Sequence, residues 1–457
     1  MQKAKAVIQS HAGFLTRPCI MLGVSQVFFF AYTFFKGSSE QYLPLLLPIF
    51  AASMLLLIVC RYTQGSYGFT IAWVELLQIG ILLQVLLGST SYHEMVILLA
   101  LSSVCVIAAP WLVAIVQACM QKHKKWIWRG GIAITMLLYL TLLLFGRSVN
   151  GTRAWLGNMS ITMQPTELAK VVSLLLMALP LAEGQATDLK RYIDALIVVA
   201  INALFLILIN ELGTLLLIGA TFLIMCLLFL PFRYSALNLG IVALAVLACV
   251  FLIFLGANGD QAQSANLLFK IGRKLNSRIT VFLNPQSDPL GEGYQASRAR
   301  MAMAVGGLLG SDQHIHVPVL TTDFAFVGLL MNMGAITGLC VIVLFAALLI
   351  YGMRISISQG ANRFQQILCA GFVFSIFLQA ALIIGGSTGF LPCTGIPVPF
   401  LSKGGTYHLV LSGMLGCILH VSGKYPLQFP IFNNKGGQKN GNITRKNHVA
   451  AEDTHGL

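Results

Sequence analysis

The stretch from Glu211 to Leu230 reads ELGTLLLIGATFLIMCLLFL, and no residue after Glu211 carries a charge. A helix rises about 1.5 Å per residue, so roughly 20 apolar residues cross the ~30 Å hydrocarbon core of a bilayer. Comparable apolar runs recur along the 457-residue chain. The chain is therefore predicted to cross a membrane many times as helices.

The composition supports this prediction. Hydrophobic residues make up 57% of the chain and charged residues 10%, whereas soluble globular proteins hold about 25% charged residues. A transmembrane β-barrel would show alternating segments of ~10 residues, and none dominates here. A soluble domain and a disordered chain are excluded, and we expect an all-α polytopic membrane protein with about 10–12 transmembrane helices.

The apolar runs place the expected helices, each close to the length that a bilayer requires. They cover residues 18–35, 43–60, 68–88, 95–120, 130–145, 165–182, 192–209, 211–230, 236–256, 323–351, 364–385 and 404–422. We divide the chain into N-terminal helices in 1–130, a membrane core in 131–422, and a polar, Lys-rich tail in 423–457. We expect this tail to be disordered.

Lysine and arginine predict the orientation, because short cytoplasmic loops are enriched in them. They gather in the loops 121–129 and 183–191. By parity both termini lie on the same side, so both are predicted to be cytoplasmic. The net charge of +14 is mostly this orientation signal. No basic domain stands apart from the apolar runs, so nucleic acid is not an expected partner.

The opposite side holds three longer segments, 146–164, 257–322 and 386–403. The middle segment is cationic although parity places it outside, and its length weakens the charge rule there. Its basic residues are Lys270, Arg273, Lys274, Arg278, Arg298 and Arg300. They either bind anionic headgroups or pyrophosphate or form only a solvated basic face, and both interpretations stay open.

Four charged residues lie within or beside the apolar runs. Glu75 is costly at membrane depth, and a hydrogen bond between helices is the simpler interpretation. Glu167 and Lys170 are three residues apart on one helix face, which suits an ion pair as well as a ligand site. Glu211 lies on a short outer turn, as either a helix cap or a site residue.

The outer segment Asn284–Gln295 reads NPQSDPLGEGYQ, and its Pro and Gly residues favour tight turns. Asp288 lies there among cations, so it is either a turn-forming residue or a general base.

His314 and His316 form an HxH pair without a third ligand, which is weak evidence for a metal. Segment 391–406 is rich in Pro and Gly. Irregular backbone at membrane depth is tolerated only inside protein or beside a water-filled cavity.

Six stretches carry motifs in a fixed order. They are Gly151-x-x-x-Trp155-Leu156-Gly157, Gln164–Lys170, Glu211–Thr214, Asn284–Gln295 followed by Gly306–Gly310, Thr322–Phe326, and Leu391–Gly405. With these motifs, from about residue 146 to residue 422, the chain resembles the SEDS family of bacterial shape, elongation, division and sporulation proteins, which includes FtsW, RodA and SpoVE. Each motif alone is moderately specific, but six in this order are not expected by chance.

The resemblance implies a SEDS-type bundle with a large extracytoplasmic loop, 257–322, in the cytoplasmic (inner) membrane of a bacterium. The family polymerises lipid II into glycan strands at the outer face of that membrane, for cell division, elongation or sporulation. It works beside a class B penicillin-binding protein, a transpeptidase. The implied activity is that of a peptidoglycan glycosyltransferase, and the family's proposed catalytic acid falls on Asp288.

In the implied reaction a base deprotonates the 4-hydroxyl of the acceptor lipid II, which attacks C1 of the donor sugar and releases undecaprenyl pyrophosphate. Cations would stabilise the charge of this leaving group, and our candidates are Arg153, Lys170 and Arg278. The motifs imply further substrate-binding roles for Glu167, Glu211, Tyr294, Gln295, Ser402 and Lys403. No cofactor is required by the sequence, and a divalent cation stays an open alternative.

Several positions depart from the family pattern. Met331 and Asn332 stand where the family usually has two acids, and Lys403 stands where it usually has Tyr. These departures suggest a divergent member and leave two alternatives open. One is a flippase or transporter of lipid-linked precursors, because Glu75 and Lys170 would suit a headgroup path. The other is a catalytically weak scaffold that recruits a class B penicillin-binding protein.

Overall fold

A computed structural model describes residues 20–21, 23–36, 39–63, 65–89, 91–149, 152–157, 162–184, 186–258, 267–288, 290–358 and 361–422. All of them belong to one compact unit, Met1–Leu427. The predicted disordered tail, 423–457, lies outside the described residues.

Helices form most of the described chain. In its first half, a helix at Gly23–Phe35 precedes α2 (Ser39–Tyr42), η1 (Leu43–Leu45), α3 (Leu46–Thr63), α4 (Tyr67–Leu86), α5 (Tyr92–Phe145), α6 (Pro165–Leu181), α7 (Asp188–Leu208) and α8 (Leu212–Phe229). The second half holds α9 (Phe232–Asn258), α10 (Leu267–Leu283), η3 (Pro285–Ser287), α11 (Glu292–Gly306), α12 (Ala325–Ser356), α13 (Arg363–Thr388) and α14 (Gly405–Val421).

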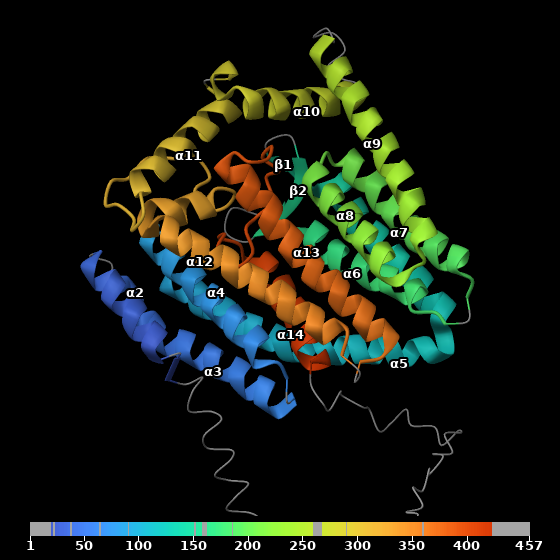
Figure 1. Ribbon diagram of the computed structural model, residues 1–457, viewed down its shortest axis with the longest axis horizontal. Helices are drawn as coiled ribbons and strands as arrows, with labels where there is room; N and C mark the ends of the chain where they lie inside the picture. The colour runs from blue at the N-terminus through green and yellow to red at the C-terminus, as the bar shows by residue number, and fades with distance from the viewer. Residues whose placement is uncertain are drawn as a thin grey trace, which may run out of the picture. The chain divides into compact units, whose positions relative to one another are not determined.

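The apolar helices confirm a multi-pass membrane fold. Within the described ranges, 9 helices are long and apolar enough to cross a membrane, and Gly23–Phe35 and α14 are shorter apolar helices. Figure 1 shows α12 and α13 side by side, and α12 also packs against α4 while α13 packs against α6 and α8. Every apolar run named in the sequence falls on a helix, so the expected helical membrane fold is confirmed.

The predicted connection at 121–129 is a kink and not a loop: Tyr92–Met120 and Lys122–Phe145 are two helices, each long and apolar enough to cross a membrane, and they meet within α5. Helical dihedral angles are interrupted within α5 only at His123 (φ −131°, ψ 37°), where the long helix kinks. The segment contains neither Gly nor Pro, so nothing in it forces the helix to end. Lys124 also forms an ion pair with Glu183, just beyond α6. The basic residues therefore lie at the kink between two candidate membrane-spanning helices.

The first two outer segments are more ordered than the sequence suggested. Residues 146–164 contain a small antiparallel sheet of β1 (Arg147–Val149), β2 (Thr152–Gly157) and β3 (Thr162–Met163), in the order β1-β2-β3. Residues 257–322 contain α10 and α11. Figure 1 shows α10 crossing the end of the bundle at which β1 and β2 lie.

A close approach at Gly80 of α4 fixes the third outer segment against the bundle. A Cβ atom at this position would lie 2.1 Å from the carbonyl oxygen of Phe400, so only glycine fits. Phe400 itself has a left-handed backbone (φ 67°) and is buried. The irregular segment 391–403 is thus held inside the protein, as its Pro and Gly content predicted.

Candidate active site

A cavity of 1380 Å³ lies where the outer segments meet the helix bundle. Its wall is made by α4, the N-terminal part of α5, β2, α10, α11 and the segment 386–409. Its charged lining residues are Glu94, Arg147, Glu211, Lys274, Arg278, Arg300, Asp323 and Lys403. Cations outnumber acids in this wall, so the cavity favours an anionic ligand.

Two of these cations come from one face of α10. Lys274 and Arg278 are four residues apart and therefore share that face. The ammonium of Lys274 donates to Thr152 Oγ1 and to the carbonyl of Asn210, both at 2.7 Å. Arg278 Nη1 donates to the carbonyl of Thr394 at 3.2 Å. These bonds hold the cationic face of α10 against β2, the α7–α8 turn and segment 391–403.

Asp323 lies beside Arg278 on the cavity wall, immediately before α12. Burial raises the pKa of Asp323 to about 6, although the Arg278 charge and a hydrogen bond with Thr322 oppose this shift. The sequence marked Thr322–Phe326 only as a motif and assigned Asp323 no role. That motif was the signal from which Asp323 could have been selected.

Asp288 lies at the end of η3, in a loop shaped by glycines. Its Oδ1 accepts a hydrogen bond from the backbone N–H of Gly291 at 3.0 Å. A Cβ atom at Gly291 would lie 2.3 Å from Asp288 Oδ2, and one at Gly293 would lie 2.1 Å from the carbonyl of Pro285. Asp288 is half-buried. It does not line the cavity itself, but Gly291 and Gln295 of the same loop do.

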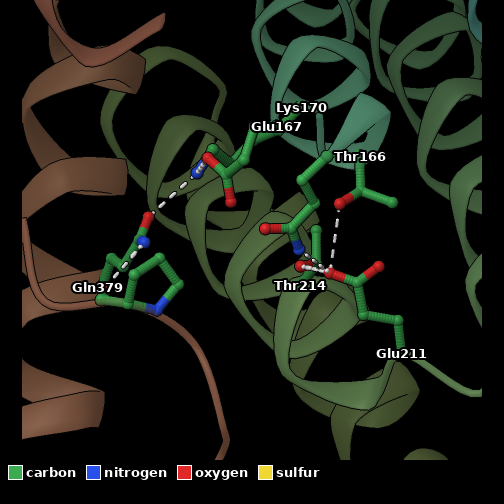
Figure 2. A network of polar contacts seen from close by, with 8 residues as sticks. Thr166, Glu167, Lys170, Glu211, Thr214 and Gln379 are labelled. Carbon is green, nitrogen blue, oxygen red and sulfur yellow. Dashed lines mark hydrogen bonds and ion pairs between the residues drawn. The ribbon is translucent and has the colours of Figure 1, made fainter. Parts of the chain in front are cut away.

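A buried polar network lies beneath the cavity (Figure 2). Lys170 Nζ is 2.5 Å from Glu167 Oε2 and donates to Gln379 Oε1 at 2.9 Å. Gln379 in turn donates to the carbonyl of Pro397 at 3.0 Å. Glu167 and Lys170 are each 2% exposed and do not line the cavity. The structure therefore shows the ion pair, which supports segment 391–403 from below.

Glu211 joins the cavity wall to this network. Its Oε1 accepts hydrogen bonds from Thr166 Oγ1 (3.2 Å), Gln164 Nε2 (3.2 Å) and Thr214 Oγ1 (2.5 Å). Burial is the main cause that raises the pKa of Glu211 to about 7, and the nearby Glu167 charge adds to it. Glu211 has no side-chain capping bond to α8, so the helix-cap interpretation is not supported.

The other predicted binding residues divide into two groups. Gln295, Ser402 and Lys403 line the cavity. Ser402 is already engaged, since its hydroxyl accepts from the Val398 N–H (2.7 Å) and donates to the Thr322 carbonyl (2.6 Å). Lys403 Nζ donates to the Ser89 carbonyl.

Arg153 and Tyr294 are exposed and lie outside the cavity lining. The Tyr294 ring is 5.9 Å from the Arg298 guanidinium, and the Arg153 N–H donates to the Ile209 carbonyl at 3.1 Å. Their substrate-binding roles remain predictions.

The departures in α12 lie in packed positions. Met331 is 1% exposed and joins a small apolar cluster with Val327 and Ala302. Asn332 donates to the Gly328 carbonyl at 2.9 Å, and its own carbonyl accepts from the Tyr32 hydroxyl at 2.5 Å. Neither residue lines the cavity. The loss of acids at these positions is therefore accommodated inside the fold.

Two further sequence alternatives have structural outcomes. Glu75 Oε1 accepts a hydrogen bond from Ser25 Oγ at 2.8 Å, which is the predicted bond between helices. No group of three or more His, Cys, Asp or Glu side chains among the described residues converges as metal ligands.

The chain is similar to known proteins over most of its length. The sequence model of the FtsW/RodA/SpoVE family, described as "Cell cycle protein", matches residues 71–425. Stage V sporulation protein E of Bacillus subtilis (strain 168) is 29% identical over 65% of this chain and 80% of its own length. A probable peptidoglycan glycosyltransferase FtsW of Marinomonas mediterranea is 30% identical over 67% of this chain and 74% of its own length.

A solved structure shows the same fold. It is described as the structural coordination of polymerization and crosslinking by a peptidoglycan synthase complex. One of its chains has a TM-score of 0.59 with 23% identity, over 78% of this chain and 97% of that chain. The resemblance seen in the sequence motifs is confirmed, and the chain belongs to the FtsW/RodA/SpoVE family of cell cycle proteins.

Proposed function

We propose that the protein is a peptidoglycan glycosyltransferase that polymerises lipid II into glycan strands at the outer face of the bacterial cytoplasmic membrane. The observation that carries this proposal is the 1380 Å³ cavity with a cationic wall, bordered by the Asp288 loop. Relatives that are about 29% identical carry the name peptidoglycan glycosyltransferase, which supports the same chemistry.

The geometry suggests how the reaction proceeds. Asp288 acts as the general base that takes the proton from the acceptor 4-hydroxyl. The hydroxyl oxygen then forms a bond to C1 of the donor sugar while the bond from C1 to the diphosphate oxygen breaks. Lys274 and Arg278 stabilise the charge that develops on the departing diphosphate. Asp323 lies on the same cavity wall, and its charge interacts with that of Arg278.

A direct displacement at C1 needs one base and no carboxylate nucleophile. This agrees with the wall, in which one oxygen of Glu211 accepts hydrogen bonds from three donors. A divalent cation, where one takes part, would be held mainly by the diphosphate oxygens, because Mg²⁺ is usually bound through substrate phosphates and only one or two carboxylates.

The partner is proposed to be a class B penicillin-binding protein, which would cross-link the strands. A complex that coordinates polymerization and crosslinking contains a chain of the same fold, and this supports the proposal. Both termini are proposed to be cytoplasmic, since Lys122, Lys124 and Lys125 flank the kink between two candidate spans, and parity places both termini on that same side.

The test is polymerisation of fluorescent lipid II by the purified protein, with and without a co-expressed class B penicillin-binding protein. We expect long glycan from the wild type and none from Asp288→Ala. Equal product from both would contradict the assigned base. Polymerisation by neither, even with the partner, would favour a scaffold. Headgroup translocation in liposomes without polymer would favour a flippase.

A further inference from the structure

Arg300 of α11 is exposed, and it lines the cavity. Its side chain forms no hydrogen bond or ion pair with any residue in the described part of the chain. Every other charged side chain of the cavity wall has such a bond or a charge interaction there, for example Lys274 and Arg278 with backbone carbonyls. A guanidinium has five N–H donors, so those of Arg300 are available to a ligand in the cavity.

The guanidinium of Arg300 lies at the end of α13, beside Gly389. A Cβ atom built at Gly389 would lie 3.7 Å from Arg300 Nη2 and 3.8 Å from Arg300 Nε. Gly389 follows α13 with a left-handed backbone (φ 84°), and it lines the cavity together with residues 386–388. The charged end of the Arg300 side chain, and not only its aliphatic part, is therefore at the cavity wall. The partial negative charge at a helix C-terminus favours a cation in this position.

The two arginines of α11, Arg298 and Arg300, lie on different sides of the helix. Arg300 is four residues after Ala296, and residues at this spacing share a helix face. Ala296 and Gln295 also line the cavity. Arg298 Nε instead donates to the His316 carbonyl at 2.9 Å, and Arg298 does not line the cavity. The helix therefore presents one arginine to the cavity, while the other bonds to the protein itself.

Cations of the cavity wall come both before and after the Asp288 loop in the chain. Lys274 and Arg278 belong to α10 and Arg300 to α11, and Figure 1 shows α11 following α10 at the same end of the bundle. The proposed reaction uses only the α10 cations, at the departing diphosphate. The substrates carry further oxyanions, since the acceptor has its own diphosphate and the peptide of each lipid II carries carboxylates. Phosphate and carboxylate both accept two parallel hydrogen bonds from a guanidinium.

We propose that Arg300 is a further substrate-binding residue, whose guanidinium binds an oxyanion of lipid II, either a phosphate or a carboxylate of the peptide. This inference rests on the proposed function and adds one residue to the binding groups assigned there. A cation on the wall of a cavity attracts an anion more strongly than a cation on an open surface, because low-dielectric walls concentrate its field. Replacing Arg300 by a neutral residue should therefore weaken the binding of lipid II.

The test measures the Kd of three fluorescent ligands in detergent: lipid II, lipid II without its peptide, and undecaprenyl diphosphate. All proteins carry Asp288→Ala, which prevents turnover. We expect Arg300→Gln to raise the Kd for lipid II by about tenfold, the loss of one charge-assisted hydrogen bond, and Arg300→Lys to raise it less, because the charge remains. Weaker binding of all three ligands would assign Arg300 to the diphosphate. Weaker binding of lipid II alone would assign it to a carboxylate of the peptide.

Arg298→Gln is the matched control, because it removes the same charge from the same helix outside the cavity lining, and it should leave each Kd unchanged. An unchanged Kd for lipid II in Arg300→Gln, or an equal rise in Arg298→Gln, would overturn the inference while the proposed function stands. Weaker binding of both forms of lipid II but not of undecaprenyl diphosphate would also overturn it, since that pattern indicates contact with the sugar. Failure of the parent protein to bind any of the three ligands would contradict the proposed function itself, and the inference with it.

Discussion

The buried network of Glu167, Lys170 and Gln379 and the outer loop around Asp288 use charge in opposite ways. In the network each charged group is closely paired and shielded, at 2.5 Å between Lys170 and Glu167. In the outer loop Asp288 is half-buried, and glycines leave room for backbone to approach it. A fully paired, shielded charge stabilises a fold, whereas a carboxylate at the edge of a cavity can exchange a proton with a ligand.

This contrast predicts that substitution of Asp288 has the largest effect on the rate of polymerisation. Asp288→Asn keeps the size of the side chain and its acceptor toward the Gly291 N–H but removes the base. We expect the rate of lipid II polymerisation to fall by about 10²–10⁴-fold, the usual contribution of general base catalysis. Thermal unfolding in detergent should stay close to that of the wild type. If Asp288→Asn unfolds at a lower temperature but polymerises lipid II at the wild-type rate, then Asp288 is a structural residue and not the base.

In the buried network, by contrast, substitutions are expected to lower the stability of the protein. Lys170→Met leaves the Glu167 carboxylate buried without its cation, and breaking a buried pair in this way costs about 3–5 kcal/mol. Thermal or denaturant unfolding in detergent should show the loss. The double variant Glu167→Gln, Lys170→Met removes both charges and should recover much of the stability. A single variant as stable as the wild type would show that the pair is not structural.

Glu211 lies between the two regions and should make stability depend on pH. Its pKa in the folded protein is raised to about 7, above about 4.3 for an ordinary Glu. The folded protein therefore holds a proton that the unfolded chain has lost, so stability decreases as pH rises from about 4.5 to about 7. Asp323, with a pKa of about 6, acts in the same direction.

We expect Glu211→Gln to flatten the dependence of the unfolding temperature on pH between about 4.5 and about 7. Asp323→Asn should flatten mainly its lower part. Unfolding curves in detergent at several pH values across this range would measure both. An unchanged slope in Glu211→Gln would show that this carboxyl group titrates normally.

The smallest effect is expected at the kink of α5. Lys124 and Glu183 form a pair that is partly open to solvent, with side-chain exposures of 37% and 29%. Such pairs contribute about 0–1 kcal/mol. Lys124→Gln should leave polymerisation unchanged and shift the unfolding temperature by little more than its error. A loss as large as that of Lys170→Met would mean that the kink at His123 depends on this pair.

The membrane architecture was predictable because it follows from local composition. Each membrane-spanning helix was marked by an apolar run, and an apolar run in a bilayer has to bond its own backbone as a helix. The form of the connection at His123 could not be found in this way, since Lys and Arg mark the cytoplasmic side whether the two helices are joined by a loop or by a kink. The strands of residues 146–164 were also missed, because short outer strands carry no such constraint.

The candidate site was also predictable only in part. Asp288, Glu211 and Gln295 were selected from motifs in the sequence, and Arg278 from the cations of the outer segment 257–322. The structure places Glu211, Arg278 and Gln295 on the cavity wall and Asp288 in the adjoining loop. Asp323 lay inside a motif but was given no role.

The sequence alone determined that the chain is a helical membrane protein and which motifs it carries, because hydropathy and motif spacing are properties of neighbouring residues. The tertiary structure alone decided which side chains share the cavity. Glu211, Arg278 and Asp323 come from segments far apart in the chain, and only the packing of α10 against the α7–α8 turn and segment 391–403 brings them to one wall. Hydrogen bonding between distant segments depends on that packing, and no local pattern records it.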